Sequence, residues 1–213
     1  MCGCLETQGQ LEGLLPPDVL LPDVPLPGPS DDIRPTQGHP IIRRWTEGPL
    51  QGKDVVEPAK WWLTPNWVTE ITHNYPSFNA RIEGIEDKPA FRGPVRYGRC
   101  VVPASAFHEW TGPRGARERW RFTRSDGAPL WFAGVSDWHD QSGLLSFAII
   151  TQPASEWMKH WHHREPALLT ADMIDRWLDR RTDYREALAM LDPDVIELEA
   201  TQISSAAPQG SLL

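Results

Sequence analysis

Prolines are frequent enough in this chain to exclude most helical architectures. The sequence has 21 prolines among its 213 residues, four of them between positions 22 and 29. Proline lacks a backbone N–H and fixes φ, so it interrupts helix interiors and central strands. We therefore expect short elements joined by rigid turns rather than a helical bundle, and the length suits a single domain.

Runs of apolar and β-branched residues predict a chain dominated by strands. The run 144–151 is the most apolar and is expected to lie at the centre of a sheet. Ser125-Asp126-Gly127 is a turn sequence, and it predicts a hairpin between strands 120–124 and 129–135. The other expected strands are 40–45 with a partner at 55–56, 78–83, 95–103, 107–110 and 195–198.

Helices are expected only late in the chain. Met173, Ile174, Trp177 and Leu178 have the spacing of one helical face, which predicts a helix over 171–178. Further helices are predicted over 153–161 and 183–191.

These elements together predict the fold class and the domain boundary. We expect an α+β fold, with a curved, mainly antiparallel, barrel-like β-sheet and a few short helices. Residues 1–203 are expected to form one domain, and the polar residues 204–213 a disordered tail.

Positive charge is concentrated in the middle of an otherwise acidic chain. The net charge is −8, yet residues 92–124 contain eight arginines and two glutamates and so carry +6. A basic surface of this kind attracts polyanions such as nucleic acid. The alternative is that these arginines pair with the acidic residues near the two ends of the chain, and the sequence leaves both open.

The cysteines and the hydropathy indicate the compartment. No apolar run approaches the ~18 residues of a membrane-spanning helix, and no N-terminal segment has the pattern of a secretion signal. Cys2, Cys4 and Cys100 do not form an even disulfide framework. We therefore expect a reduced, cytoplasmic protein with no membrane partner.

Cys2 offers chemistry that no internal cysteine has. Removal of Met1 would expose an α-amine of pKa about 8 beside a thiol of pKa about 8.5. The amine can condense with an aldehyde to an imine, and the thiol can then close a five-membered thiazolidine ring. The alternative is that Cys2 belongs to a frayed terminus without a function.

Such an amine needs groups that move protons. Glu109 ends an apolar strand between two aromatic residues, a setting that tends to raise a carboxyl pKa and favours general acid/base catalysis. Its alternative fate is a salt bridge to a nearby arginine. His162 lies in a histidine-rich segment beside Arg164, which suits proton transfer near a phosphate. Cys2 and Cys4 have no second cysteine pair to complete a ligand set, so we expect no metal and no cofactor.

Other residues are suited to holding a substrate. Asn79 and Arg81 share one face of a predicted strand, where the amide can bond a reacting centre and the guanidinium a phosphate. Of the three tryptophans around Pro65, Trp61 and Trp62 are expected in the core. Trp67 is the better candidate for a surface that stacks on bases.

Taken together, these segments resemble the SOS response-associated peptidase (SRAP) family over about residues 2–180. Order and spacing both match. The segments are Met-Cys-Gly at the start, Pro-Thr-Gln at 35–37, Trp-x-Leu-x-Pro-x-Trp at 61–67, Asn-Ala-Arg-x-Glu at 79–83, Cys-x-x-Pro-Ala-x-x-Phe-x-Glu-Trp at 100–110 and His-x-Arg-x-Pro at 162–166.

The resemblance implies a specific activity. Members of this family lose Met1 and crosslink the exposed Cys2 to the ring-opened aldehyde of an abasic site in single-stranded DNA, as a stable thiazolidine. By position, Asn79 would orient the ring, Glu109 would handle protons during imine formation and His162 would assist ring closure or reversal. Arg81 and Arg164 would hold the flanking phosphates, and Trp67 and Trp110 would stack on bases or wedge against them. A monomer that associates with the nucleoid when it binds DNA is expected.

The sequence departs from the family pattern at four positions. Cys4 stands where arginine is usual, Asp32 replaces an asparagine, Glu165 a methionine, and His108 a tyrosine or phenylalanine. Two of these changes add acid, which should weaken phosphate binding more than chemistry. Two other functions stay open, namely an N-terminal-nucleophile cysteine peptidase that processes its own Met1–Cys2 bond, and a non-catalytic protein that binds single-stranded DNA.

Overall fold

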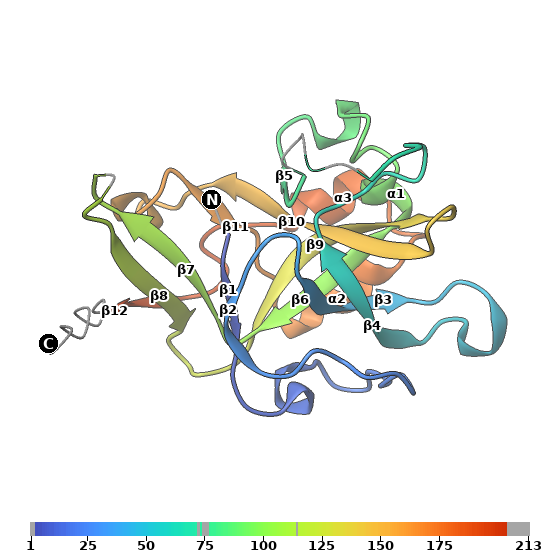
Figure 1. Ribbon diagram of the computed structural model, residues 1–213, viewed down its shortest axis with the longest axis horizontal. Helices are drawn as coiled ribbons and strands as arrows, with labels where there is room; N and C mark the ends of the chain where they lie inside the picture. The colour runs from blue at the N-terminus through green and yellow to red at the C-terminus, as the bar shows by residue number, and fades with distance from the viewer. Residues whose placement is uncertain (1–2, 72, 74–76, 114, 204–213) are drawn as a thin grey trace, which may run out of the picture.

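A closed five-stranded barrel forms the centre of the protein. The structure, a computed structural model, describes residues 3–71, 73, 77–113 and 115–203. The barrel strands are β3 (Gly38–Arg44), β4 (Asp54–Trp61), β6 (Arg99–Ala104), β9 (Leu130–His139) and β10 (Leu144–Pro153). They pair in the ring β10-β4-β3-β6-β9-β10, in which only the β10–β4 pair is parallel. Two short strands, β5 (Asn79–Arg81) and β11 (Arg164–Pro166), also pair with β10, β5 in parallel and β11 in antiparallel orientation (Figure 1).

A second sheet is antiparallel throughout. Its order is β12-β8-β7-β1-β2, and its strands are Leu198–Ile203, Glu118–Arg124, Ala106–Thr111, Leu5–Thr7 and Ser30–Ile33. Phe107 and Phe122 face each other across β7 and β8 with ring centroids 4.8 Å apart. Phe107 also contacts Phe132 of the barrel, so this sheet packs on the barrel through aromatic side chains.

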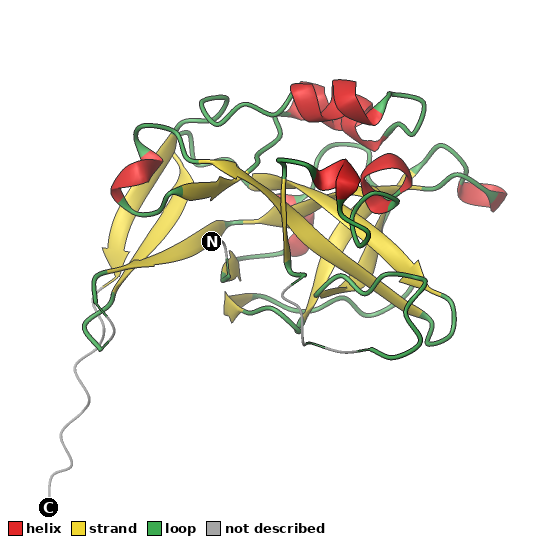
Figure 2. Ribbon diagram, turned by 90° about the horizontal axis from the view of Figure 1, so that it is seen from above, coloured by secondary structure: helices red, strands yellow, loops and turns green. Residues whose placement is uncertain are grey.

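Two hydrophobic cores divide the interior. The first core joins the barrel to the second sheet and contains Leu5, Trp61, Phe107, Phe122 and Ile149. The second core lies between the barrel and the helices α1 (Pro94–Tyr97), α2 (Ala171–Leu178) and α3 (Tyr184–Ala189). The helices lie at the periphery of the strands (Figure 2). Adjacent residues of β10 alternate between the cores, because successive side chains of a strand point to opposite faces.

Arg99 fastens the helices to the barrel. Its buried guanidinium donates to the carbonyl oxygens of Trp177 and Asp179, both at 2.6 Å, and to that of Val95 at 3.0 Å. These carbonyls lie at the ends of α2 and near α1, where helix termini leave backbone groups without an intrahelical partner. One side chain from the arginine-rich segment therefore serves the interior of the fold.

Much of the predicted architecture is confirmed. The fold is mostly β, barrel-like and mainly antiparallel, with few helices. The pairing of 40–45 with 55–56, the central place of 144–151 and the helix over 171–178 are all found. The residues 204–213, expected as a disordered tail, lie outside the described residues. None of the helices in the described part of the chain is long and apolar enough to cross a membrane.

The predicted hairpin between 120–124 and 129–135 is wrong. The turn at Gly127 forms, with φ of 73°, yet β8 pairs with β7 and β12 while β9 pairs with β6 and β10. The two strands therefore belong to different sheets. A turn sequence reverses the chain locally, but pairing between the flanking strands depends on which partners complete each core.

Three smaller predictions also need correction. Residues 95–97 are helical rather than extended, because Pro94 starts α1 and Gly98 ends it where a Cβ would lie 2.0 Å from the carbonyl oxygen of Ser136. The helix expected over 153–161 is only a 3-10 turn at Met158–His160. The last strand begins at Leu198, three residues later than expected.

Candidate active site

The start of the chain is held against the strand that carries Glu109. Leu5 of β1 lies opposite Phe107 of β7, and the backbone N–H of His108 donates to the carbonyl of Cys4 at 3.0 Å. Antiparallel pairing in this register brings Gly3, the first described residue, toward Glu109. Met1 and Cys2 precede it and lie outside the described residues. The candidate site is therefore built from the side chains near the start of β1.

Glu109 faces the first core. Phe107 belongs to that core, and alternation along β7 places Glu109 on the same face two residues later. Its partner across the sheet is Trp120, which packs against the same core. The Glu109 side chain is 4% exposed, and burial raises the pKa of its carboxyl group. A carboxyl group in this setting holds its proton at a higher pH than usual and can serve as a general acid.

Asn79 faces the first core from the barrel side. β5 runs parallel to β10, with Asn79 opposite Ile149 and Ala80 opposite Ile150. Ile149 belongs to the first core and Ile150 to the second, so Asn79 is directed to the same core as Glu109. Asn79 is buried, whereas Arg81, two residues along the same face, is exposed.

His162 reaches the same core through its neighbour. Trp161 packs on the first core, with its ring centroid 5.6 Å from that of Trp120. The Nδ1 atom of His162 lies 3.0 Å from both the backbone nitrogen and the carbonyl oxygen of Arg164. Burial lowers the pKa of the imidazole to about 4, so His162 is neutral at pH 7. The backbone of Arg164 holds Nδ1 of His162, so a proton transfer would use Nε2.

One aromatic core therefore brings together three segments that are far apart in the sequence and that carry Asn79, Glu109 and His162. Asn79 follows Phe78, Glu109 lies across from Trp120, and His162 follows Trp161. Phe78, Trp120 and Trp161 all pack at the border of the first core. The border combines a buried acid, a neutral imidazole and an amide, which are groups that can donate, accept and orient during addition to a carbonyl.

Arg164 is engaged inside the protein. It is 6% exposed, its Nη2 donates to the Thr151 carbonyl at 2.5 Å, and its guanidinium forms an ion pair with Glu83 through bonds of 2.5 and 2.9 Å. These contacts join β11, β10 and the end of β5. They also fix the backbone that holds Nδ1 of His162. Of the two candidate phosphate-binding arginines, Arg81 is exposed to solvent and Arg164 is buried.

The two candidate stacking residues have different surroundings. Trp67 is 62% exposed. Trp110, beside Glu109, is half-buried, and two guanidinium groups lie over its ring, with Arg34 at 4.7 Å and Arg119 at 5.6 Å from the ring centroid. The sequence reasoning did not single out Arg34 or Arg119. No local sequence pattern could have pointed to this pair, because Arg119 comes from β8 and Arg34 directly follows β2, and the two meet only in the folded protein.

Three of the four departures from the family pattern are in contact. The thiol of Cys4 donates to Asp32 Oδ1 at 3.2 Å, and Arg119 Nε donates to His108 Nδ1 at 3.2 Å. Arg119 Nη2 lies 3.5 Å from Cys4 Sγ and 3.8 Å from Asp32 Oδ1. The negative charge of Asp32 is therefore partnered locally, by Arg119 and by Arg34 at 2.6 Å.

Neither of the described thiols is a nucleophile at neutral pH. Burial raises the pKa of Cys4 to about 12, and burial does the same for Cys100. The thiolate is the reactive form of cysteine. Both residues are also buried.

The arginines of the 92–124 segment have different surroundings, and Arg121 shows the expected pairing with an acidic residue near the start of the chain. Arg121 pairs with Glu6 of β1 at 2.8 Å, and Arg124 pairs with Asp126 at 2.5 Å. These arginines, like Arg99, serve internal contacts. Arg92 and Arg96 instead line a groove beside α1.

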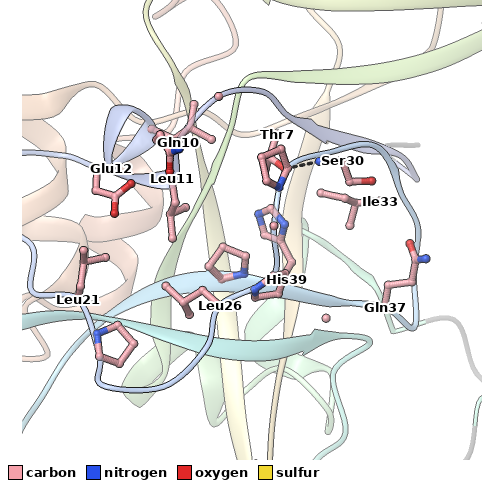
Figure 3. Close-up of a pocket in the computed structure, with 18 of the residues that line it drawn as sticks. Thr7, Gln10, Leu11, Glu12, Leu21, Leu26, Ser30, Ile33, Gln37 and His39 are labelled. Carbon is pink, nitrogen blue, oxygen red and sulfur yellow. Dashed lines mark hydrogen bonds between the residues drawn. The ribbon is translucent and has the colours of Figure 1, made fainter.

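A larger cavity has no part in this site. This cavity has a volume of about 460 Å³ and is lined largely by residues between 9 and 40. Figure 3 shows Leu11, Leu21 and Leu26 among the residues that line it. Glu12 is the one charged residue in its lining, and none of Asn79, Glu109 and His162 reaches it. No group of three His, Cys, Asp or Glu side chains in the described ranges is placed to hold a metal ion.

Comparisons with known proteins identify the family and the fold of this chain. The family model described as "SOS response associated peptidase (SRAP)" matches residues 1–208. "Abasic site processing protein YoaM" of Bacillus subtilis (strain 168) is 35% identical over 184 residues, 83% of this chain and 78% of that protein. "Abasic site processing protein HMCES" of Gallus gallus is 32% identical over 200 residues, 78% of this chain and 58% of that protein. A crystal structure of a Bordetella bronchiseptica protein has the same fold, with a TM-score of 0.81 over 96% of this chain and 100% of that chain at 22% identity.

Proposed function

We propose, since this chain belongs to the SOS response associated peptidase family, that it processes abasic sites in DNA by forming a covalent adduct through Cys2. The relatives named above are called abasic site processing proteins, and this supports the substrate. The ring-opened form of an abasic site carries an aldehyde, which is the group that an amine and a thiol on adjacent carbons capture. Single-stranded DNA is the proposed form of the substrate, because the lesion must be accessible to a buried acid.

The proposed reaction has two steps and releases one water. After removal of Met1, the α-amine of Cys2 adds to the aldehyde carbon, and loss of the hydroxyl group as water gives an imine. The thiol of Cys2 then adds to the imine carbon, and its proton moves to the nitrogen. The product is a thiazolidine that joins the protein to the sugar, with no change in oxidation state.

Each residue of the site has a role in this scheme. Glu109, whose pKa is raised by burial, donates the proton that lets the hydroxyl group leave as water. His162, neutral at pH 7, accepts a proton from the attacking amine or thiol through Nε2. Asn79 orients the opened sugar. Arg81 contacts a flanking phosphate, while Arg164 acts by holding the His162 segment through its bonds to Thr151 and Glu83.

The proposal rests on two features: the segments that carry Asn79, Glu109 and His162 all border the first core, and the register of β1 with β7 directs the start of the chain toward Glu109. The buried, protonated states of Cys4 and Cys100 add to it, because they leave the thiol of Cys2 to react. The exposed Trp67 and the half-buried Trp110 supply flat surfaces for the neighbouring bases.

A gel assay tests the proposal. Purified protein is incubated with single-stranded DNA that contains one abasic site, and heat-stable adducts are separated on a denaturing gel. Wild type and Cys4→Ala are expected to form the adduct, and Cys2→Ala is expected to form none. Intact mass spectrometry should find the wild-type protein without Met1.

Two results would contradict the proposal. An adduct that persists in Cys2→Ala would place the reactive group elsewhere. Salt-sensitive binding of the same DNA without any covalent product would instead identify a non-catalytic DNA-binding protein.

A further inference from the structure

A groove beside α1 gathers positive charge on a chain that is acidic as a whole. It has a volume of about 370 Å³ and lies between α1, the end of β9 and the segment that carries Trp67. Arg43, Arg92, Arg96 and Arg180 line it, and Asp137 is the one acidic residue in its lining. The net charge of the chain is −8, so four arginines around one groove are a local reversal. We refer to it as the α1 groove.

Most of these arginines lack a carboxylate partner. Arg43 is paired with Glu57 at 2.7 Å. Arg92, Arg96 and Arg180 form no ion pair with any residue that the structure describes. The carboxylate of Asp137 accepts instead from the backbone N–H groups of Asn66 at 2.9 Å and Trp138 at 3.0 Å. Three of the four arginines of the α1 groove therefore carry positive charge that no ion pair with a described residue neutralises.

The positions of these side chains are fixed by neutral contacts. Arg96 donates to the carbonyl of Arg92 at 3.0 Å and stacks on the ring of Tyr184 at 4.7 Å. Arg180 donates to Thr46 Oγ1 at 3.1 Å. Burial and the nearby charge of Arg43 both lower the pKa of Arg180. An anion in the α1 groove would relieve this repulsion, and phosphate is the anion that guanidinium groups bind with the best geometry.

Exposed aromatic rings line the same groove. Trp67 is 62% exposed, Tyr97 64% and Trp138 47%. Large aromatic side chains that stay this exposed beside cationic groups offer stacking surfaces for bases. A nucleotide carries both a phosphate and a flat base. The arginines and the exposed aromatic rings of the α1 groove together match these two groups, and neither set of side chains alone would indicate a nucleotide.

The α1 groove is connected to the proposed site through the Trp67 segment and β10. The Trp67 segment is bonded to β10, where the N–H of Thr64 donates to Ser146 Oγ at 2.8 Å. Ser146 precedes Ile149, the partner of Asn79, by three residues, which is about 10 Å along a strand. The segment that carries Trp67 is therefore bonded to the same strand that pairs with Asn79.

We propose that the α1 groove binds nucleotides of a single strand next to the abasic site, with Arg92 and Arg96 on phosphates and Tyr97 on a base. That the ligand is a DNA strand with an abasic site rests on the proposed function. The groove itself recognises a phosphate-bearing nucleotide, and a free nucleotide carries the same chemistry. The test therefore uses DNA without a lesion, so that it does not depend on adduct formation.

Fluorescence anisotropy measures the affinity for lesion-free strands of about 4 and about 12 nucleotides. For Arg92→Ala we expect about five- to tenfold weaker binding of the long strand and a salt slope smaller by about 0.7. For Tyr97→Ala we expect a similar loss of affinity with an unchanged salt slope, because stacking releases no counterions. Arg176→Ala, which removes an exposed arginine on α2, is the matched control and should bind like wild type.

Adduct formation with a short abasic strand separates this proposal from the proposed function. Arg92→Ala should crosslink the short strand at the wild-type rate. If the wild-type protein forms no adduct, the proposed function is overturned, but the binding results on lesion-free DNA still stand. Equal affinity of Arg92→Ala and Arg176→Ala for the long strand would overturn the groove proposal. Binding of a deoxynucleoside monophosphate can be measured by quenching of tryptophan fluorescence. If its affinity equals that of the long strand, a free nucleotide rather than a DNA strand is the ligand of the α1 groove.

Discussion

The backbone N–H of His108 donates to the carbonyl of Cys4 at 3.0 Å, and this bond directs the start of the chain toward Glu109. The bond continues the antiparallel pairing of β1 with β7, in which Leu5 lies opposite Phe107. The first described residue, Gly3, is thus brought to the strand that carries the buried carboxyl group. Strand pairing, rather than a long-range side-chain contact, sets this geometry.

Glu109→Gln should slow adduct formation by about 100-fold, because general acid/base groups contribute on this scale. Glutamine keeps the shape and can still form hydrogen bonds, but it cannot release a proton when the hydroxyl group leaves as water. The measurement is a time course of the adduct on a denaturing gel. Glu118→Gln, an exposed position on the paired strand β8, is the control and should react like wild type. An unchanged rate in Glu109→Gln would remove Glu109 from the mechanism.

Local signals in the sequence were sufficient for elements whose partners are close along the chain. The β3–β4 pair and α2 follow from β-branched runs and helical spacing alone. β8 and β9 are separated by a good turn sequence, yet each completes a different sheet. Which core a strand joins depends on residues that are distant in the sequence, and no local pattern carries that information.

The candidate site likewise has features that the sequence could predict and features that it could not. Glu109 could be singled out from its aromatic neighbours, and the structure finds it buried with a raised pKa. The bonds of Arg164 to Glu83 and Thr151 could not be predicted, because β5, β10 and β11 meet only in the folded barrel. The cluster of Cys4, Asp32 and Arg119 likewise forms from three segments that are distant in the sequence.

Glu83→Gln separates the two possible roles of Arg164. If Arg164 acts by holding the His162 segment, loss of the Glu83 charge loosens that segment, and adduct formation should slow by about tenfold without tighter DNA binding. If Arg164 instead binds a phosphate, its release from Glu83 should strengthen DNA binding and steepen the salt dependence. Anisotropy and the gel time course distinguish the outcomes. Glu86→Gln, a nearby acid that forms no ion pair with a described residue, is the matched control.

His162 should add no inflection near pH 6.5 to the pH dependence of adduct formation. The pKa of His162 is about 4, so the imidazole stays neutral as the pH falls from 7 to 5.5. The rate in this range should follow the free α-amine, whose pKa is about 8, and the carboxyl group of Glu109, whose pKa is raised by burial. His162→Gln should lower the rate at every pH and keep the shape of the profile. A steeper fall below pH 6.5 that disappears in His162→Gln would mean that the imidazole titrates normally.

Acid should destabilise the protein through two buried histidines. Burial lowers the pKa of His39 and of His108 to about 4, below the ordinary value of 6.5. Between these values the unfolded chain binds more protons than the folded one, so the free energy of unfolding falls as the pH decreases from 6.5 toward 4. The loss approaches about 3 kcal/mol for a fully buried histidine with a shift of this size. The buried carboxyl groups of Glu109 and Glu165 have raised pKa values and act in the opposite direction.

His39→Gln isolates the histidine contribution from these opposing groups. Glutamine can still donate to the carbonyl of Pro103, which His39 Nε2 contacts at 2.8 Å, but it does not titrate. Urea unfolding at pH 7 and pH 5 should therefore give a smaller acid-induced loss of stability in His39→Gln than in wild type. His160→Gln, at an exposed position, should keep the wild-type pH dependence. Equal losses in His39→Gln and wild type would mean that His39 takes up no proton on unfolding.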